Sequence, residues 1–168
     1  MTSLLADDAA IISHNPLDLV EDLINSFEWP YERTSDDEIT AAAKGTWCEY
    51  HIRAFWREDD AILQVASVFD MRVPEAKRAA LCETLALVNE RLWLGHFELW
   101  AEDGAVLFRH ATFIDSGAGL SQAHAEMLLQ TAVSECERFY PVFQFVLWAG
   151  KKPAEAVEAA MLETVGEA

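Results

Sequence analysis

Histidine and cysteine are the side chains most able to bind a metal or act as a nucleophile, and this chain scatters both. The sequence contains neither HExxH nor Cys-x-x-Cys spacing, and its three cysteines fall in three different expected elements. The histidines are interpreted as surface or strand-edge residues: His14, His51, His96, His110 and His124. His96 and His110 are expected on opposite faces of one hairpin, so they cannot share a metal. The sequence therefore predicts no metal site.

The remaining polar patterns also fall short of a catalytic or cofactor motif. Gly117-Ala118-Gly119 precedes a helix, whose first backbone amides could hold an anion, but the glycines form no phosphate loop. No serine lies in the elbow motif of a serine hydrolase. Cys48 and Cys82 are interpreted as inert core thiols, and Cys136 lies among acids that suppress its thiolate. We therefore expect no catalytic residue, no cofactor and no enzyme activity.

Aromatic and arginine side chains form a candidate surface with a chemical character of its own. Alternation along residues 47–57 places arginine and aromatic side chains on the outward face of a strand. The candidate protein-binding patch consists of Trp47, Arg53, Phe55, Arg57 and Trp100. Tryptophan and arginine are enriched at binding hot spots. The competing interpretation is that the C-terminal tail or a neighbouring helix covers them. The other tryptophans are compatible with core positions: Trp29, Trp56, Trp93 and Trp148.

Composition bounds the class of protein. A chain of 168 residues that is 52% hydrophobic makes about one domain with a substantial core. Its formal charge of -17 repels nucleic acid and anionic membranes, and favours basic partners or plain solubility. No Lys or Arg precedes Arg33, and no uncharged apolar stretch is long enough to span a membrane. We expect a cytoplasmic protein with reduced cysteines that binds neither nucleic acid nor membrane.

Apolar periodicity and turn residues predict a single α+β domain in which an antiparallel sheet packs against helices. The expected order is α-β-β-β-β-α-β-β-α with a short C-terminal helix. The expected elements are a helix from Pro16, strands at 31–34, 39–43, 47–57 and 61–69, a helix at 74–94, a hairpin at 96–109 and a helix from Ser121. Residues 1–14 are interpreted as a flexible N-terminus, 15–150 as the domain and 151–168 as the tail helix.

Turn residues also predict how the strands pair. A turn at Asp59-Asp60 puts Tyr50 and Ile52 on the core face of its hairpin. Asp103-Gly104 predicts a two-residue type I′ turn, which pairs Glu98 with Arg109.

The helix expected at 121–150 is apolar on nearly every side, which requires cover all round. The core faces of both hairpins supply that cover, so this segment is interpreted as the central packing helix. Pro141 removes one backbone hydrogen bond and should kink the helix near Glu137.

The element order, together with Glu137-Arg138-Phe139-Tyr140-Pro141 before a hydrophobic run, resembles the YbjN family of bacterial proteins. The resemblance covers roughly residues 16–150. It implies the fold of class I type III secretion chaperones, a non-enzymatic role, and a regulator of stress or sensory transduction. Chaperones of that fold are small acidic homodimers that hold a non-globular segment of an effector. The resemblance supplies no catalytic residue.

These observations favour a non-enzymatic protein-binding domain, either chaperone-like or regulatory. Its partner is expected to be another protein or a second copy in a homodimer. Candidate dimer surfaces are the helix at 74–94, the outer face of the hairpin at 47–69 and the tail helix. The alternative is a small-molecule sensor with a pocket between the sheet and the long helix.

Overall fold

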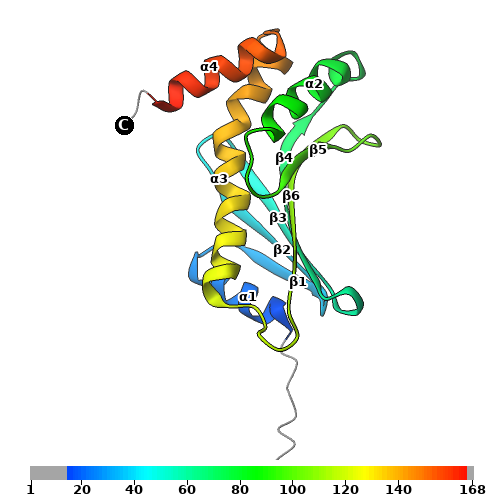
Figure 1. Cartoon of the computed structure of the whole chain (residues 1–168), viewed down its shortest axis with the longest axis vertical. Helices are drawn as coiled ribbons and strands as arrows, with labels where there is room; N and C mark the ends of the chain where they lie inside the picture. Colours follow the sequence, from blue (N-terminus) through cyan, green and yellow to red (C-terminus); the bar gives the residue numbers. More distant parts are fainter. Residues whose placement is uncertain (1–14, 166–168) are drawn as a thin grey trace, which may run out of the picture.

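A computed structural model describes residues 15–165, and it consists of one sheet with its helices (Figure 1). The six strands are antiparallel, in the order β1-β2-β3-β4-β6-β5. The strands are β1 Tyr31–Ser35, β2 Glu38–Lys44, β3 Glu49–Arg57, β4 Ile62–Arg72, β5 His96–Leu99 and β6 Ala105–Phe113. The helices are α1 Pro16–Ser26, α2 Arg78–Asn89, α3 Gln122–Leu147 and α4 Pro153–Val165. The predicted fold class and element order are confirmed.

Helix starts follow their capping residues. The Asn15 side chain accepts a hydrogen bond from the Leu17 amide at 2.9 Å, and Pro16 occupies the first turn of α1. The Ser121 hydroxyl accepts from the His124 amide at 3.2 Å and starts α3. The expected flexible N-terminus, residues 1–14, lies outside the described residues. Figure 1 shows α3 along the long axis, with α1 at one end and α2 and α4 at the other.

One hydrophobic core joins the helices to the inner face of the sheet. α1 contributes Leu17 and Ile24, α2 contributes Leu81, and α3 contributes Phe139 and Phe143, all fully buried. Aromatic rings meet at the centre, where Phe69, Phe97, Phe139 and Phe143 pack at tilted or edge-on angles. α3 continues through Pro141 as one helix, with a buried face running its whole length.

Of the two predicted hairpin registers, that of β3–β4 is confirmed and that of β5–β6 is wrong. In the β3–β4 hairpin, Ile52 lies opposite Ser67 and Trp56 opposite Leu63, which is the predicted register. In the β5–β6 hairpin, Glu98 lies opposite Leu107, two residues away from the prediction. The type I′ turn is wrong because it needs positive φ at both central residues. Only Gly104 has one, at 73°, and the Trp100 amide bonds to the Ala105 carbonyl across a longer loop.

Three residues expected in the core are exposed instead. Trp93 is 99% exposed because α2 ends at Asn89, four residues before it, so no helix carries it toward the sheet. Trp148 is 65% exposed at the C-terminal cap of α3. Cys82 is also exposed, on the outer side of α2. Core assignment failed where an element ended earlier than the apolar pattern suggested or where that pattern covered the outer side of a helix.

Candidate functional site

The sheet has one face packed on the helices and one face open to solvent. Burial alternates along β3 from exposed to buried, and β2 alternates between half-buried and buried. We call the outward side the open sheet face. Its residues follow from the strand registers: Thr40, Ala42, His51, Arg53, Phe55, Arg57, Ile62, Gln64, Ala66, Val68, Leu107, Arg109, Ala111 and Phe113. Alanines lie among its longer side chains, Leu107 is fully buried, and Phe113 is 66% exposed at one end.

Ion pairs hold the arginines of the open sheet face in place. Arg53 bonds to Glu38 on the neighbouring strand, and Arg57 bonds to Asp60 at 2.7 Å. Arg109 bonds to Glu98 across the hairpin, so the predicted pair forms, although diagonally rather than directly opposite. Burial alone would raise the pKa of Glu98, but hydrogen bonds from Arg109 and Trp100 bring it below its ordinary value. The face therefore presents fixed guanidinium planes beside small apolar side chains.

The structure divides the predicted patch. Arg53, Phe55 and Arg57 are successive outward residues of β3 and lie together on the open sheet face. Trp100 lies at the far end of the β5–β6 hairpin, three strands away from β3, where its indole donates to Glu98 at 3.1 Å. Trp47 is not on this face at all. The structure separates Trp47 from the other four residues and leaves Trp100 beside Glu98 at the β5 edge of the face. That these residues bind a protein stays a prediction.

Trp47 instead packs on α3 (ring centroids 6.3 Å apart from Tyr140, nearly parallel) and donates its indole N–H to the Glu137 carbonyl at 3.1 Å. Pro141 has no N–H, so the carbonyl four residues before it, that of Glu137, lacks its helical donor. The indole supplies the missing donor from 90 residues away in the chain.

The Glu137 side chain completes what we call the Glu137 latch: Thr46, Trp47, Tyr50 and Glu137. Its carboxylate accepts the Thr46 amide at 2.9 and 3.0 Å, and the Tyr50 hydroxyl at 2.5 Å. A Cβ on Gly45 would meet the carboxylate and the Tyr50 ring at 2.3 Å, so only glycine fits there. The latch ties the β2–β3 turn to the middle of α3.

The Glu137 latch offers no available acid, base or nucleophile for catalysis. Burial raises the pKa of Glu137, but the hydrogen bonds from Thr46 and Tyr50 outweigh it and the pKa falls below its ordinary value. Burial, and then the bond to Glu137, raises the pKa of Tyr50 far above its ordinary value. Burial also strongly raises the pKa of the neighbouring Cys136 thiol, so it stays protonated. A carboxylate that already accepts hydrogen bonds from the Thr46 amide and the Tyr50 hydroxyl is a structural group rather than a general base.

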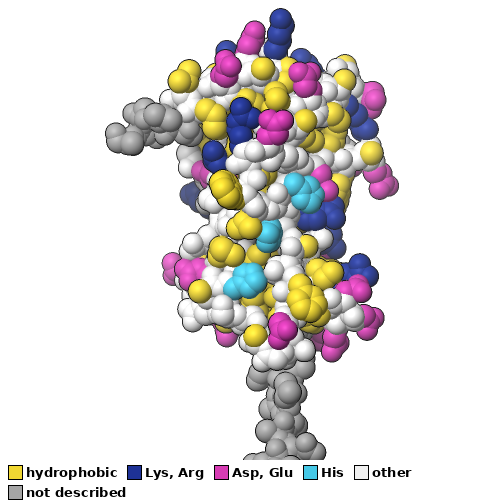
Figure 2. Space-filling model, viewed as in Figure 1, with side chains coloured by type: hydrophobic (Ala, Val, Ile, Leu, Met, Phe, Trp, Pro, Cys, Tyr) yellow, Lys and Arg dark blue, Asp and Glu magenta, His cyan; other side chains and the backbone are white. Residues whose placement is uncertain are grey.

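A second carboxylate-rich region lies at the α1 end of the molecule. A hollow of about 550 Å³ opens between α1, the β3–β4 turn and the loop that precedes α3. A neighbouring hollow of about 560 Å³ shares Asn15, Trp56 and Glu58 with it. We call the two together the end groove. Acidic and hydrophobic side chains appear together at this lower end of the molecule in Figure 2.

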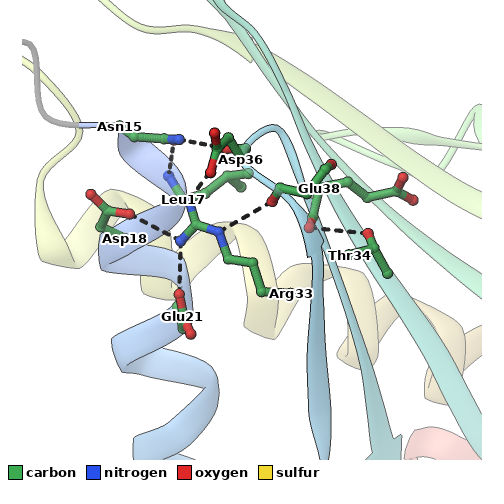
Figure 3. Close-up of polar contacts among 9 residues, drawn as sticks. Asn15, Leu17, Asp18, Glu21, Arg33, Thr34, Asp36 and Glu38 are labelled. Carbon is green, nitrogen blue, oxygen red and sulfur yellow. Dashed lines mark hydrogen bonds and ion pairs between the residues drawn. The ribbon is translucent and has the colours of Figure 1, made fainter.

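Arg33 fixes the α1 wall of the end groove (Figure 3). Its guanidinium binds Asp18 at 2.9 Å and Glu21 at 2.7 Å, both on α1. The Asn15 amide donates to the Asp36 carbonyl at 2.6 Å, in the turn after β1. These bonds hold the start of α1 against the β1–β2 turn.

Two backbone amides of the loop before α3 already have hydrogen-bond acceptors within the loop. The Asp115 carboxylate accepts the Gly117 amide at 2.8 Å and the Ala118 amide at 2.9 Å, so these donors do not face an external anion. Across residues 15–165, no three His, Cys, Asp or Glu side chains are grouped so that they could hold a metal ion. No helix in that same range has the length and apolar character needed to cross a membrane.

The comparisons with known proteins agree with this architecture. Residues 16–145 match the model of the YbjN family, described as "Putative bacterial sensory transduction regulator". Among solved structures, the chain is similar to "YbjN, a putative transcription regulator from E. coli", with a TM-score of 0.53 and 6% identity over 72% of this chain and 85% of that one. Such low identity shows the fold alone. No curated protein matches. Since the family model spans most of its length, the chain belongs to the YbjN family.

Proposed function

We propose that this protein is a non-enzymatic regulator that works by binding another protein, or a second copy of itself, through the open sheet face. The observation that carries the proposal is the outward side of β3, where the exposed side chains of His51, Arg53 and Arg57 lie in line and ion pairs fix the two arginines. A shallow hollow of about 440 Å³ on it, lined by residues including Tyr31, His51 and Val68, gives a partner a place to insert a side chain.

Two further observations support binding over catalysis. The matched family is described as a regulator rather than as an enzyme. The Glu137 latch, which gathers a carboxylate, a tyrosine and a neighbouring cysteine, is closed by its own hydrogen bonds. Chaperone-like binding of an extended segment and regulation by a folded partner both use an open sheet face, so we propose both within the one protein-binding role.

The test compares Phe55→Ser on the open sheet face with Met127→Ser, an exposed apolar residue on α3. Sedimentation equilibrium measures self-association. Phe55→Ser should weaken it roughly tenfold, the effect of losing one well-packed anchor, while Met127→Ser leaves it unchanged. If the wild type is a monomer, the two variants are compared for binding to the protein that crosslinks to the wild type in cells. Equal effects from both variants, or none, would overturn the proposal.

The alternative function, a small-molecule sensor, was expected to have its pocket between the sheet and the long helix. The three hollows described above are lined by residues outside α3, at the α1 end and on the open sheet face. A pocket between the sheet and the long helix is filled instead by the aromatic core around Phe69 and Phe143.

A further inference from the structure

The floor of the end groove is apolar. Leu19 from α1, Trp56 from the end of β3, and Ile114 and Leu120 from the loop before α3 line the first hollow, of about 550 Å³. Trp56 is half-buried and is shared with the neighbouring hollow. An aromatic ring at the junction of two hollows offers a flat surface on which a ligand side chain can lie.

The rim of the end groove is acidic. The first hollow is lined by Asp18, Asp22, Glu58 and Asp115, and none of its lining residues is Lys, Arg or His. The neighbouring hollow adds Asp36, Asp37 and Asp59 against Arg57, which is bound to Asp60.

The rim carboxylates differ in whether the protein already engages them. Asp18 binds Arg33, and Asp115 accepts loop amides. Asp22 and Glu58 are exposed, and within residues 15–165 their side chains have no hydrogen bond or ion pair. They differ in this respect from Glu137, whose oxygens accept the Thr46 amide and the Tyr50 hydroxyl.

We propose that the end groove binds a basic segment of a partner protein, with the aliphatic stem of an arginine or lysine against Trp56 and its charged head between Asp22 and Glu58. Long basic side chains lay their methylenes on apolar surface and keep the charge at a polar rim. A cation near the tryptophan face adds a favourable interaction. The negative field of a chain with formal charge -17 concentrates such a partner at the groove.

An extended peptide segment fits better than the other occupants. The two hollows adjoin at Asn15, Trp56 and Glu58, so a segment with two basic residues can engage both, whereas a small cation fills one. Residues 1–14 precede Asn15 in the chain, but they contain Asp7 and Asp8 and no Lys or Arg, so the same charge argument opposes them. Phe55 and Arg57 belong both to the open sheet face and to the neighbouring hollow, whereas no residue of that face lines the hollow that holds Asp22. The inference therefore does not depend on the function proposed for that face.

The experiment titrates the full chain, labelled with ¹⁵N and at low salt, with the peptide acetyl-Leu-Arg-Leu-Arg-Leu-amide. A peptide with citrulline in both arginine positions keeps the size and removes the charge. The arginine peptide should shift the Trp56 indole N–H and the Gly117 and Gly119 amides, and the citrulline peptide should bind at least about tenfold more weakly.

A double variant, Asp22→Asn with Glu58→Gln, keeps the shape of the rim and should weaken the arginine peptide on the order of tenfold. The matched control is Glu83→Gln with Glu90→Gln, two exposed acids on and just after α2 at the other end of the molecule, and it should leave the affinity unchanged. Equal weakening by the control shows nonspecific attraction and overturns the proposal. So do equal binding of the citrulline peptide, shifts confined to the open sheet face, or equally tight binding of arginine amide alone.

Discussion

The Glu137 latch and the end groove use carboxylates in opposite ways. In the latch one carboxylate meets the Thr46 amide and the Tyr50 hydroxyl, and a glycine is required to let them approach. In the end groove several carboxylates surround an apolar floor, and those of Asp22 and Glu58 have no protein donor within the described residues. The difference shows that the number of donors facing an acid, rather than the acid itself, decides whether it supports the fold or remains available to a ligand.

The largest expected effect is at the latch. Glu137→Ala leaves the Tyr50 hydroxyl and the Thr46 amide without their acceptor, and should lower the free energy of unfolding by about 2–3 kcal/mol. Urea denaturation measures it. Glu135→Ala, two residues earlier on α3 in a 3.5 Å pair with Arg138, should cost less than about 0.5 kcal/mol. Equal stability of these two variants would contradict the structural role of the Glu137 carboxylate. So would a loss of stability in Asp22→Asn with Glu58→Gln as large as that in Glu137→Ala.

A smaller effect tests why Trp47 belongs to the latch. Trp47→Phe keeps a ring over Tyr140 but removes the N–H that serves the Glu137 carbonyl, and should cost about 1 kcal/mol. Pro141→Ala restores the helical N–H that would otherwise serve this carbonyl. In that background the cost of Trp47→Phe should shrink, with a coupling energy of about 0.5–1 kcal/mol. Urea denaturation of the wild type, the two single variants and the double variant measures this coupling. If the two substitutions lower the free energy of unfolding additively, Trp47 acts through ring packing alone.

The smallest effect is a pH dependence. The pKa of Glu137 is lowered in the folded protein, so below the unfolded value of about 4.3 the unfolded chain binds more protons and folding stability falls with falling pH. The contribution of Glu137 to folding stability is fully present above the unfolded pKa and is lost as the pH drops through the lower pKa of the folded state. Urea denaturation from pH 6 to pH 3 should show a shallower loss for Glu137→Gln than for the wild type. Identical slopes would mean that the latch does not discriminate between the two protonation states.

Local patterns were enough to predict the element order and one register. The β3–β4 register was predictable because the acidic turn between the two strands limits it and one face is apolar. The β5–β6 register was not, because Asp103-Gly104 suits a two-residue turn and also the end of a longer loop. The even displacement of two residues kept Phe97 and Phe108 on the core face, so the prediction of faces survived the wrong register.

The functional surfaces were only partly predictable, because they depend on contacts between distant segments. Alternation along one strand placed Arg53, Phe55 and Arg57 together, but it assigned Trp47 to the same side without knowledge of α3. Pro141 held a usable signal, since a proline inside a helix leaves a carbonyl that needs a donor from elsewhere. The acids of the end groove come from four separate segments and have no common spacing, so no motif predicts the groove.

The proline in α3 also affects how the domain unfolds. The interior of a helix normally pairs its own backbone groups, so no other segment is needed to complete its hydrogen bonds. Here the Glu137 carbonyl is served by an indole from the β2–β3 turn, so the middle of α3 and that turn depend on each other. Separating them exposes an unsatisfied carbonyl and an unsatisfied carboxylate together. The turn and the helix therefore form one cooperative unit, whose amide hydrogens exchange together rather than turn by turn.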